Sequence, residues 1–259
     1  MLCSGLTKRV IVLMKNSMYT PEQLAALSGG NAYKQTPLGG QYYDTINLGN
    51  EGKYYMNFYS QLKDQRQDPE EVTAPFTAII LKPRRKLIQW DNREKVLESI
   101  EYDAGATTIP TTQGNMTEKE AKSRGAKVQI VLYMLMQGRI VRTVVTGSSL
   151  YNPEDIDDMR LYAYLQSFGD DEHMFMYNTI IGSKPSVYTD KEGFDKTTYQ
   201  MTFKRGAAHT SLDEVGTALT QLAESLVDND ARDLKYLGSS KPAQAAIATE
   251  AIDPNSVPF

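Results

Sequence analysis

The stretch AKVQIVLYMLMQGRIVRTVVTG, residues 126–147, contains the clearest structural pattern in this chain. Two runs of mostly apolar residues, many of them β-branched, flank the dipeptide Gln137-Gly138. Two such runs separated by a two-residue turn with glycine are typical of antiparallel strands joined in a tight hairpin. We therefore start the predicted fold from this hairpin.

The two faces of the first predicted strand differ in polarity. Side chains alternate along a strand, and one face of this strand is wholly apolar, with Val128, Ile130, Leu132 and Met134. The opposite face includes Lys127, Gln129 and Tyr133. We expect the first face to form the core and the second to be the more exposed side.

Upstream of the hairpin, residues 73–91 predict one long strand, or two bent strands with Pro83 at an edge or a bulge. Residues 104–118 are rich in turn-forming residues and predict a long loop. Downstream, Asn152 and Pro153 have the character of a helix start, and the apolar spacing predicts a helix that ends at Gly169.

Two more strands are predicted at residues 172–183 and 196–206. They precede a predicted amphipathic helix at residues 211–227, where Ser211 and Glu214 have capping-box spacing. The expected class is mainly β with flanking helices (α+β). The element order, with one helix between the third and fourth main strands, matches a five-stranded OB-fold-like barrel.

The composition divides the chain into three predicted parts. Residues 1–71 are rich in Gly, Asn, Gln and Tyr and predict an N-terminal extension or arm on the main domain. Residues 72–237 contain the OB-fold-like domain and its C-terminal helix. Residues 238–259 lack a core-forming pattern and predict a flexible tail.

Several functional classes are disfavoured by composition. One cysteine and two histidines argue against a Cys/His zinc site, and no metal or cofactor is expected. No apolar run is long enough to span a bilayer and no secretory signal is recognised, so we expect a cytoplasmic protein without a membrane partner.

Enzyme signatures are also weak. The chain has no Gly-rich phosphate loop, and GSSLY at residues 147–151 lacks nucleophile-elbow spacing. Asp155, Asp157 and Asp158 are candidate metal ligands, but acids in the first turn of a helix are explained by the helix dipole. We therefore expect no catalytic residues.

Charge is unevenly distributed, although the net charge is −4. Residues 77–90 contain four cations and no acid, and residues 120–147 contain five cations against one acid. Cations that follow a phosphate backbone, interleaved with aromatic rings that stack on bases, are typical of sequence-tolerant single-strand binding. The alternative is that the cations form solvated faces and the aromatics pack internally.

On the nucleic-acid interpretation, the expected contacts come from the first long strand, the hairpin region and the last strand. They are Lys82, Arg84, Arg85, Lys86, Trp90, Lys122, Arg124, Lys127, Tyr133, Arg139, Tyr199, Phe203 and Arg205.

The chain ends in EAIDPNSVPF, with Asp253 followed by Pro258 and Phe259. Here it resembles the single-stranded DNA-binding proteins of bacteria and their phages, which join an OB-fold to a flexible tail ending in acids and Pro-Phe. The resemblance covers the element order over residues 73–206 and the last few residues, but not the first 70. It departs from the family in having Asp253 alone where a run of acids is usual.

The resemblance implies that the protein binds and protects single-stranded DNA during replication, recombination or repair. It implies that Asp253, Pro258 and Phe259 dock on replication or recombination proteins. The unusual arm favours a phage or mobile-element version, which would act in the host cytoplasm. Two alternatives stay open: a phage structural or assembly protein, and a metal-dependent nucleic-acid-processing enzyme.

Overall fold

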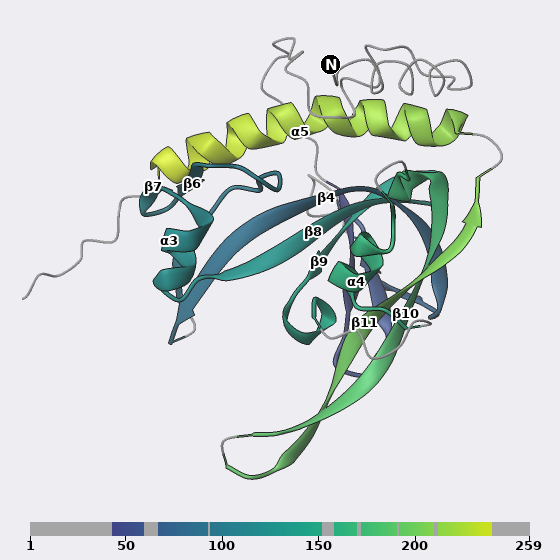
Figure 1. Cartoon of the computed structure of the whole chain (residues 1–259), viewed down its shortest axis with the longest axis horizontal. Coiled ribbons are helices and arrows are strands. Elements are labelled where there is room, and N and C mark those ends of the chain that lie inside the picture. Colours follow the sequence, from purple (N-terminus) through teal and green to yellow (C-terminus); the bar gives the residue numbers. More distant parts are fainter. Residues whose placement is uncertain are drawn as a thin grey trace, which may run out of the picture.

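The computed structural model describes residues 43–59, 67–92, 94–151, 158–169, 172–190, 192–209 and 212–239. These residues form a mainly β structure, a mixed sheet of nine strands with a long C-terminal helix (Figure 1). The strands are β1 (Asp44–Leu48), β2 (Tyr54–Asn57), β3 (Glu70–Val72), β4 (Phe76–Asp91), β5 (Glu94–Glu98), β6 (Ile109–Thr111), β7 (Gly114–Met116), β8 (Lys127–Met136), β9 (Arg139–Val145), β10 (Tyr177–Thr189) and β11 (Asp195–Ala208). The helices are α3 (Glu118–Ser123), α4 (Leu161–Gln166) and α5 (Asp213–Ser239), with short 3-10 turns η2 (Gly147–Ser149) and η3 (Met174–Met176).

The predicted hairpin is confirmed as β8 and β9, which pair in antiparallel register from Ile130–Val145 to Met136–Arg139. Gln137 and Gly138 both have positive φ, 50° and 72°. That pair of left-handed conformations matches the right-handed twist of the strands, and it is the reason for glycine at the second position.

The long strand predicted before the hairpin is also confirmed. It is β4, which pairs with β8 over most of its length and with β10 at its beginning. The β4–β8 register shifts between Ile80 and Lys82, just before Pro83, so the bulge that the sequence predicts near this proline is present.

Strand order across the sheet is β11-β10-β4-β8-β9-β1-β2-β3, and β5 pairs with the end of β4. The closed barrel that the sequence predicts is not found in the described part of the chain, where the sheet is open. β1 pairs in parallel with the side of β9 that faces away from β8. This side of β9 is therefore not free to pair with β11 and close a barrel, and β1 is a strand that the sequence pattern did not predict.

Part of the predicted N-terminal arm belongs to this sheet. β1 and β2 form an antiparallel pair, and β3 extends it at the far edge. The expectation of an extension outside the main fold is thus corrected for residues 44–57 and for residues 70 and 71 of β3. Residues 1–42 lie outside the described residues.

Both faces of the central strands are buried, each by a different partner. Val128, Ile130, Leu132 and Met134 face a core shared with Leu161 and Tyr164 of α4, as expected. Val131, Tyr133 and Leu135 on the opposite face pack under α5, against Val215, Leu219 and Leu222. The prediction that the Tyr133 face is exposed is therefore wrong, because the amphipathic C-terminal helix covers it.

Three further predictions change at their boundaries. The loop predicted at residues 104–118 contains the small β6–β7 hairpin and leads directly into α3. Within the described part of the helix predicted from Asn152, Leu161–Gln166 are helical and Met159 makes a β-bridge with Phe203. Residues 152–157 lie outside the described residues. The helix predicted at residues 211–227 begins at Asp213 and continues to Ser239, past the predicted start of the tail.

Within the described residues, no helix has the length and apolar character that a membrane-spanning helix needs.

Candidate nucleic-acid interface

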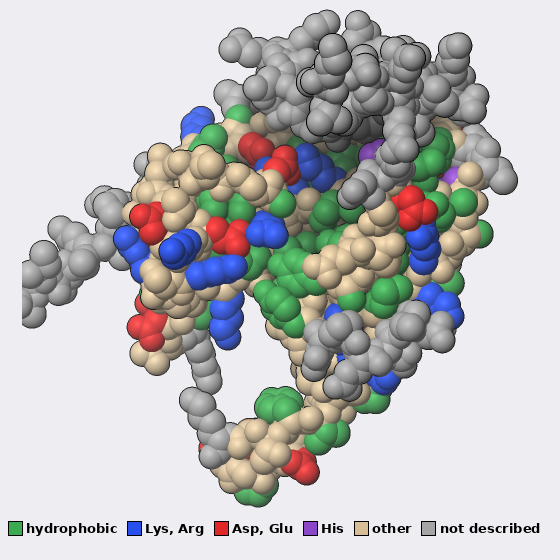
Figure 2. All heavy atoms as spheres, viewed as in Figure 1, with side chains coloured by type: hydrophobic (Ala, Val, Ile, Leu, Met, Phe, Trp, Pro, Cys, Tyr) green, Lys and Arg blue, Asp and Glu red, His purple; other side chains and the backbone are tan. Residues whose placement is uncertain are grey.

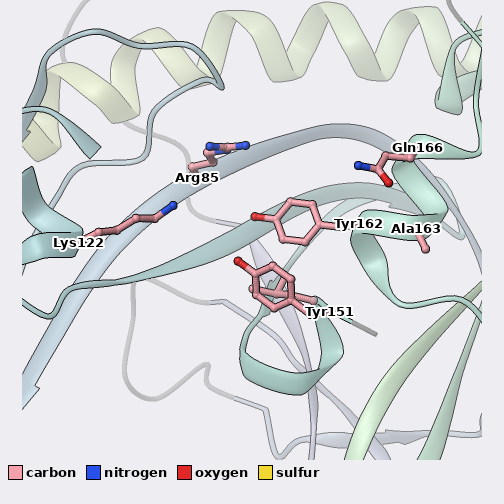
Figure 3. Close-up of a pocket in the computed structure, with 7 residues that line it drawn as sticks. Arg85, Lys122, Tyr151, Tyr162, Ala163 and Gln166 are labelled. Carbon is pink, nitrogen blue, oxygen red and sulfur yellow. The ribbon is translucent and has the colours of Figure 1, made fainter. Parts of the chain in front are cut away.

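A groove opens on the face of the sheet opposite α5, between α3 and α4 (Figure 3). Its volume is about 390 Å³, and its lining residues are Arg85, Lys122, Leu150, Tyr151, Tyr162, Ala163 and Gln166. Figure 2 shows Lys and Arg side chains over the α3 region, beside an apolar patch near the centre of this face. The groove thus has a cationic wall and an aromatic wall.

The aromatic wall is built by the segment that leaves β9. Gly147 has a positive φ of 57°, which turns the chain into η2, and buried Leu150 anchors the end of this turn. Tyr151 follows at once and is 58% exposed. Buried Leu150 thus places Tyr151 at the groove.

Tyr162 completes the aromatic wall from α4. Its backbone amide donates to the Leu150 carbonyl at 3.2 Å, which ties α4 to the η2 segment. On the other side of α4, Leu161 and Tyr164 are fully buried, and the Tyr164 hydroxyl shares a 2.6 Å hydrogen bond with the Thr179 hydroxyl. The buried side of α4 thus fixes the side that carries Tyr162, Ala163 and Gln166.

The two tyrosine rings lie 5.0 Å apart between centroids, with 41° between their planes. Burial, together with the neighbouring Tyr151, raises the pKa of the Tyr162 hydroxyl, so it remains protonated at neutral pH. In Figure 3 both hydroxyl groups point toward the side of the groove where Lys122 lies. The pair presents aromatic faces and hydroxyl donors to the same space.

The cationic wall begins with Arg85 on β4. Arg84 and Arg85 are adjacent, so strand alternation sends them to opposite faces. The Arg84 guanidinium lies on the α5 side, where it binds both carboxylate oxygens of Asp230 at 2.6 and 2.9 Å. Arg85 points to the groove and is 29% exposed.

Lys122 supplies the second cation from α3. This short helix begins with a complete capping box, in which Thr117 and Glu120 satisfy each other's backbone amides. Buried Ala121 fixes the helix against the core, and Lys122 remains 50% exposed. In Figure 3 the Lys122 and Arg85 side chains converge on the same end of the groove.

Glu118 lies between these two cations. One of its carboxylate oxygens accepts from Arg85 Nη1 at 2.9 Å and from the Tyr102 hydroxyl at 3.0 Å. The other lies 2.7 Å from Lys122 Nζ. Burial alone would raise the pKa of Glu118, but hydrogen bonds from Lys122, Arg85 and Tyr102 lower it to about 2.

This arrangement can bind a flexible polyanion that also has flat rings. Arginine and lysine bind phosphate oxygens through charge-assisted hydrogen bonds, and an exposed tyrosine ring stacks on any base. Both kinds of group lie in one hollow, so phosphate and base of the same nucleotide chain can be contacted together.

Only two of the predicted contact residues, Arg85 and Lys122, line the groove. Lys82, Arg84 and Lys86 alternate with Arg85 along β4 and do not line it. Lys82 pairs with Asp103 at 3.0 Å and Lys86 with Glu98 at 2.6 Å. Arg84 is 5% exposed, so the expectation that the four cations are solvated together is wrong for Arg84.

Two predicted stacking residues are core residues. Tyr133 is 2% exposed and its hydroxyl donates to Glu101 at 2.6 Å beneath α5, whereas Phe203 is fully buried with α4. The prediction of base contact by these two rings is wrong, because both rings are buried. Tyr199 is half-buried, and its ring packs so closely on Gly52 that a side chain there would clash.

The remaining predicted residues lie outside the groove lining. Trp90 is 55% exposed near the end of β4, with Lys95 over its ring. Arg205 pairs with Glu172 at 2.7 Å and lies over the rings of Phe168 and Tyr177. Lys127, the first residue of β8, and Arg139, the first residue of β9, are both exposed. Arg124 contacts Gln113 at 3.3 Å.

Sequence reasoning missed Leu150, Tyr151, Tyr162, Ala163 and Gln166. A signal was present for part of this set. Tyr162 and Gln166 are four residues apart, which places them on the same side of a helix whose other side contains Leu161 and Leu165. Nothing in the sequence spacing placed Tyr151 beside them.

Residues 43–59, 67–92, 94–151, 158–169, 172–190, 192–209 and 212–239 contain no group of three or more His, Cys, Asp or Glu side chains arranged to hold a metal. Asp155 and Asp157 lie outside the described residues, and so do Asp253, Pro258 and Phe259 of the predicted partner-binding tip. The structure thus leaves the tip as a prediction.

Comparisons of this chain with protein-family models, with curated proteins and with solved structures each found no significant match.

Proposed function

We propose that this protein binds single-stranded DNA, without strong sequence preference, in the groove between α3 and α4. The observation that carries the proposal is the pairing of an exposed aromatic wall, Tyr151 and Tyr162, with two cations, Arg85 and Lys122, around one hollow. The rings stack on unpaired bases, and the cations hold the phosphates. The protein would protect exposed strands during replication, recombination or repair.

A single strand fits this groove better than a duplex does. The bases of a duplex are stacked on one another and face inward, so the tyrosine rings would meet only sugar and phosphate. An unpaired strand can turn its bases toward Tyr151, which is 58% exposed. Stacking does not distinguish strongly among the four bases, because every base has a flat face.

The strand pairing supports an opened OB-like fold as part of this proposal. β4 pairs with β8 and β10, β8 pairs with β9, and β10 pairs with β11, with α4 between β9 and β10. An OB-fold connects its five strands and single helix in this order, and it binds oligonucleotides on its sheet face and in its long connections. In this chain, the segment containing α3 and the β10–β11 ribbon occupy the places of those connections (Figure 1).

The β10–β11 ribbon extends the proposed binding path. Its outer half projects from the sheet (Figure 1), and Tyr188 and Phe194 near its tip are 51% and 64% exposed. Tyr188 lies opposite Lys196 in the ribbon register. A ring and a cation at this position offer a further nucleotide the same combination of contacts as the groove.

The tail completes the proposal. Residues 240–259, beyond the end of α5, would act as a tethered ligand for replication or recombination proteins, with Phe259 as the anchor and Asp253 and Pro258 beside it. A terminal aromatic residue offers a ring for an apolar pocket and a carboxylate for a cation. We place the protein in the cytoplasm, and in the host cytoplasm if a phage encodes it.

A second candidate, a contact between subunits of a phage assembly, is favoured by the same ribbon tip, where Val187 is also 65% exposed. Exposed apolar side chains gathered at one place are typical of protein interaction sites. Sedimentation over a range of protein concentrations tests it: association that is lost in a Val187→Ser, Phe194→Ser variant would support this candidate.

Fluorescence anisotropy tests the main proposal. The protein is titrated into a labelled oligo-dT and into a duplex of equal length, at about 50 and 200 mM salt, the range over which phosphate contacts lose affinity. We expect tighter binding to the single strand at both salt concentrations and weaker binding at the higher one. Equal affinity for the two DNAs, or affinity that salt does not change, would overturn the proposal.

A further inference from the structure

Glu118 is an acidic residue at the cationic end of the groove, and the role that we assign to it rests on the proposed function. Its carboxylate accepts from Arg85, Lys122 and the Tyr102 hydroxyl, at 2.9, 2.7 and 3.0 Å. Both cations that line the groove are therefore already paired with one acid of the same chain. A phosphate that enters the groove meets cations that are occupied.

A carboxylate and a phosphate accept hydrogen bonds from arginine and lysine in the same way. Glu118 has a donor on each oxygen and a third from a buried tyrosine, so it occupies the position that a phosphate oxygen would need. We infer that Glu118 is a built-in competitor of the DNA phosphate, which DNA must displace from Arg85 and Lys122 when it binds.

The contacts of Glu118 are of the kind that can exchange. Lys122 is 50% exposed and pairs with Glu118 across one helical turn, and such exposed pairs contribute little to stability. Arg85 is 29% exposed and faces the groove, so its guanidinium can turn from one acceptor to another without leaving its strand. Tyr102 is buried and can keep its hydrogen bond to Glu118 while the two cations change partner.

Glu118 therefore weakens the binding of anions in the groove and makes the groove more selective for a strand that also stacks on the tyrosine rings. With Glu118 ionised, the groove end has two positive charges and one negative charge, so a single stray anion gains little by binding there. A strand that also stacks on Tyr151 and Tyr162 gains enough to displace the carboxylate. Because hydrogen bonds hold the pKa of Glu118 near 2, the acid stays ionised at neutral pH, and DNA rather than protonation must displace it.

The chain offers a matched control in Glu98. This acid is 21% exposed, compared with 22% for Glu118, and it also pairs with two cations, Lys86 at 2.6 Å and Lys95 at 3.3 Å. It does not line the groove. Glu98→Gln and Glu118→Gln therefore change the net charge equally, and only Glu118→Gln frees cations in the groove.

The test compares oligo-dT binding by wild type, Glu118→Gln and Glu98→Gln in the full chain by fluorescence anisotropy. We expect Glu118→Gln to bind about fivefold more tightly or better, and Glu98→Gln to stay within about twofold of wild type. The salt dependence of Glu118→Gln should be steeper by up to about 0.7 in log–log slope, which is the value for one additional phosphate contact on a single strand. Unchanged or weaker binding by Glu118→Gln would overturn the inference.

A second measurement uses the unaltered protein and does not depend on the variant folding. The carboxyl carbon of Glu118 is followed by NMR between about pH 4 and 6, with and without oligo-dT. We expect Glu118 to titrate in this range only when DNA has taken its cations, since a free carboxyl group of this type titrates near 4.5. A Glu118 chemical shift that does not change with pH either with or without oligo-dT would overturn the inference. If wild type shows no preference for single-stranded DNA, the proposed function itself fails; if it binds and Glu118→Gln does not tighten, only this inference fails.

Discussion

Arg84 and Arg85 are neighbours on β4 and belong to opposite faces of the sheet: Arg84 pairs with Asp230 of α5, and Arg85 lines the groove beside Glu118. The sequence presents them as one cationic run, but the strand gives them different environments. Arg84 is 5% exposed and holds α5 on the sheet, whereas Arg85 is 29% exposed and pairs with Glu118 in the groove. Substituting them one at a time separates stability from binding.

Arg84→Ala should lower the free energy of unfolding by about 3 kcal/mol, because removing one partner leaves Asp230 without its counter-charge. We take the low end of the usual range since the Asp230 side chain is 34% exposed. The affinity of the folded fraction for oligo-dT should not change. Arg85→Ala should do the reverse, with weaker binding to all base compositions alike and little loss of stability.

Urea denaturation and anisotropy titration on the two variants provide the check. The Arg84 side chain is 6% exposed and that of Asp230 34%, so salt screens this pair less than a surface pair and the stability loss should persist at high salt. If Arg84→Ala weakens DNA binding and Arg85→Ala does not, DNA binds on the α5 face of the sheet and not in the groove.

Tyr151→Ala should weaken binding to oligo-dT by about 1–3 kcal/mol, the usual contribution of one stacked base. Tyr151→Phe should retain most of the affinity, because the ring does the stacking. Neither change should alter the melting temperature much, since the side chain is 58% exposed.

Tyr236→Ala is the matched control for this prediction. Tyr236 is 68% exposed on α5, the helix that covers the opposite face of the sheet. Its substitution should leave affinity unchanged. Equal losses from Tyr151→Ala and Tyr236→Ala would mean that the effect is not specific to the groove.

The stabilising effect of Glu118 should depend on pH in a defined direction. Its pKa in the folded protein is about 2, below the ordinary value of 4.5, so the folded state favours the ionised form. The stabilisation is therefore fully present above about pH 4.5 and is lost as the pH falls toward 2. Wild type should be more stable than Glu118→Gln at pH 7, and this difference should shrink in urea denaturation at pH 4 and again at pH 3. A difference that stays constant over that range would contradict the ion-pair geometry.

Deletion of residues 252–259 should leave oligo-dT affinity unchanged or slightly higher, because an anionic tail can compete with DNA for cations. It should abolish co-purification of a replication or recombination protein that full-length chain retains on a column. The substitution Phe259→Ala should have nearly the same effect as the deletion if the ring is the anchor. Partner retention by both variants would count against the tail as a ligand.

Much of the fold could be predicted from the sequence, because its central strands have strong local signals. The turn at Gln137-Gly138 and the apolar alternation of Val128–Ile130–Leu132 depend only on neighbours in the chain. The open edge could not be predicted in the same way. It depends on β1, a five-residue strand whose partner β9 is about one hundred residues away in sequence.

The site was harder to predict for a related reason. Arg85 and Lys122 were found by charge, but charge alone did not separate Arg85 from buried Arg84. The expectation for Tyr133 was wrong because a polar-looking strand face is exposed only if nothing covers it, and α5 begins about eighty residues downstream. Tyr151 and Tyr162 come together through the η2 turn, which has no distinctive sequence pattern apart from Gly147.

The most direct test of the central claim is to locate the bound strand by photochemical cross-linking. An oligonucleotide that contains 5-iodouracil is irradiated in complex with the full chain, and the attached residue is identified by peptide mass spectrometry. Our account predicts attachment at Tyr151 or Tyr162, the exposed ring pair of the groove. Adducts confined to the α5 face, such as Tyr236, with none in the peptides that contain Tyr151 and Tyr162, would contradict it.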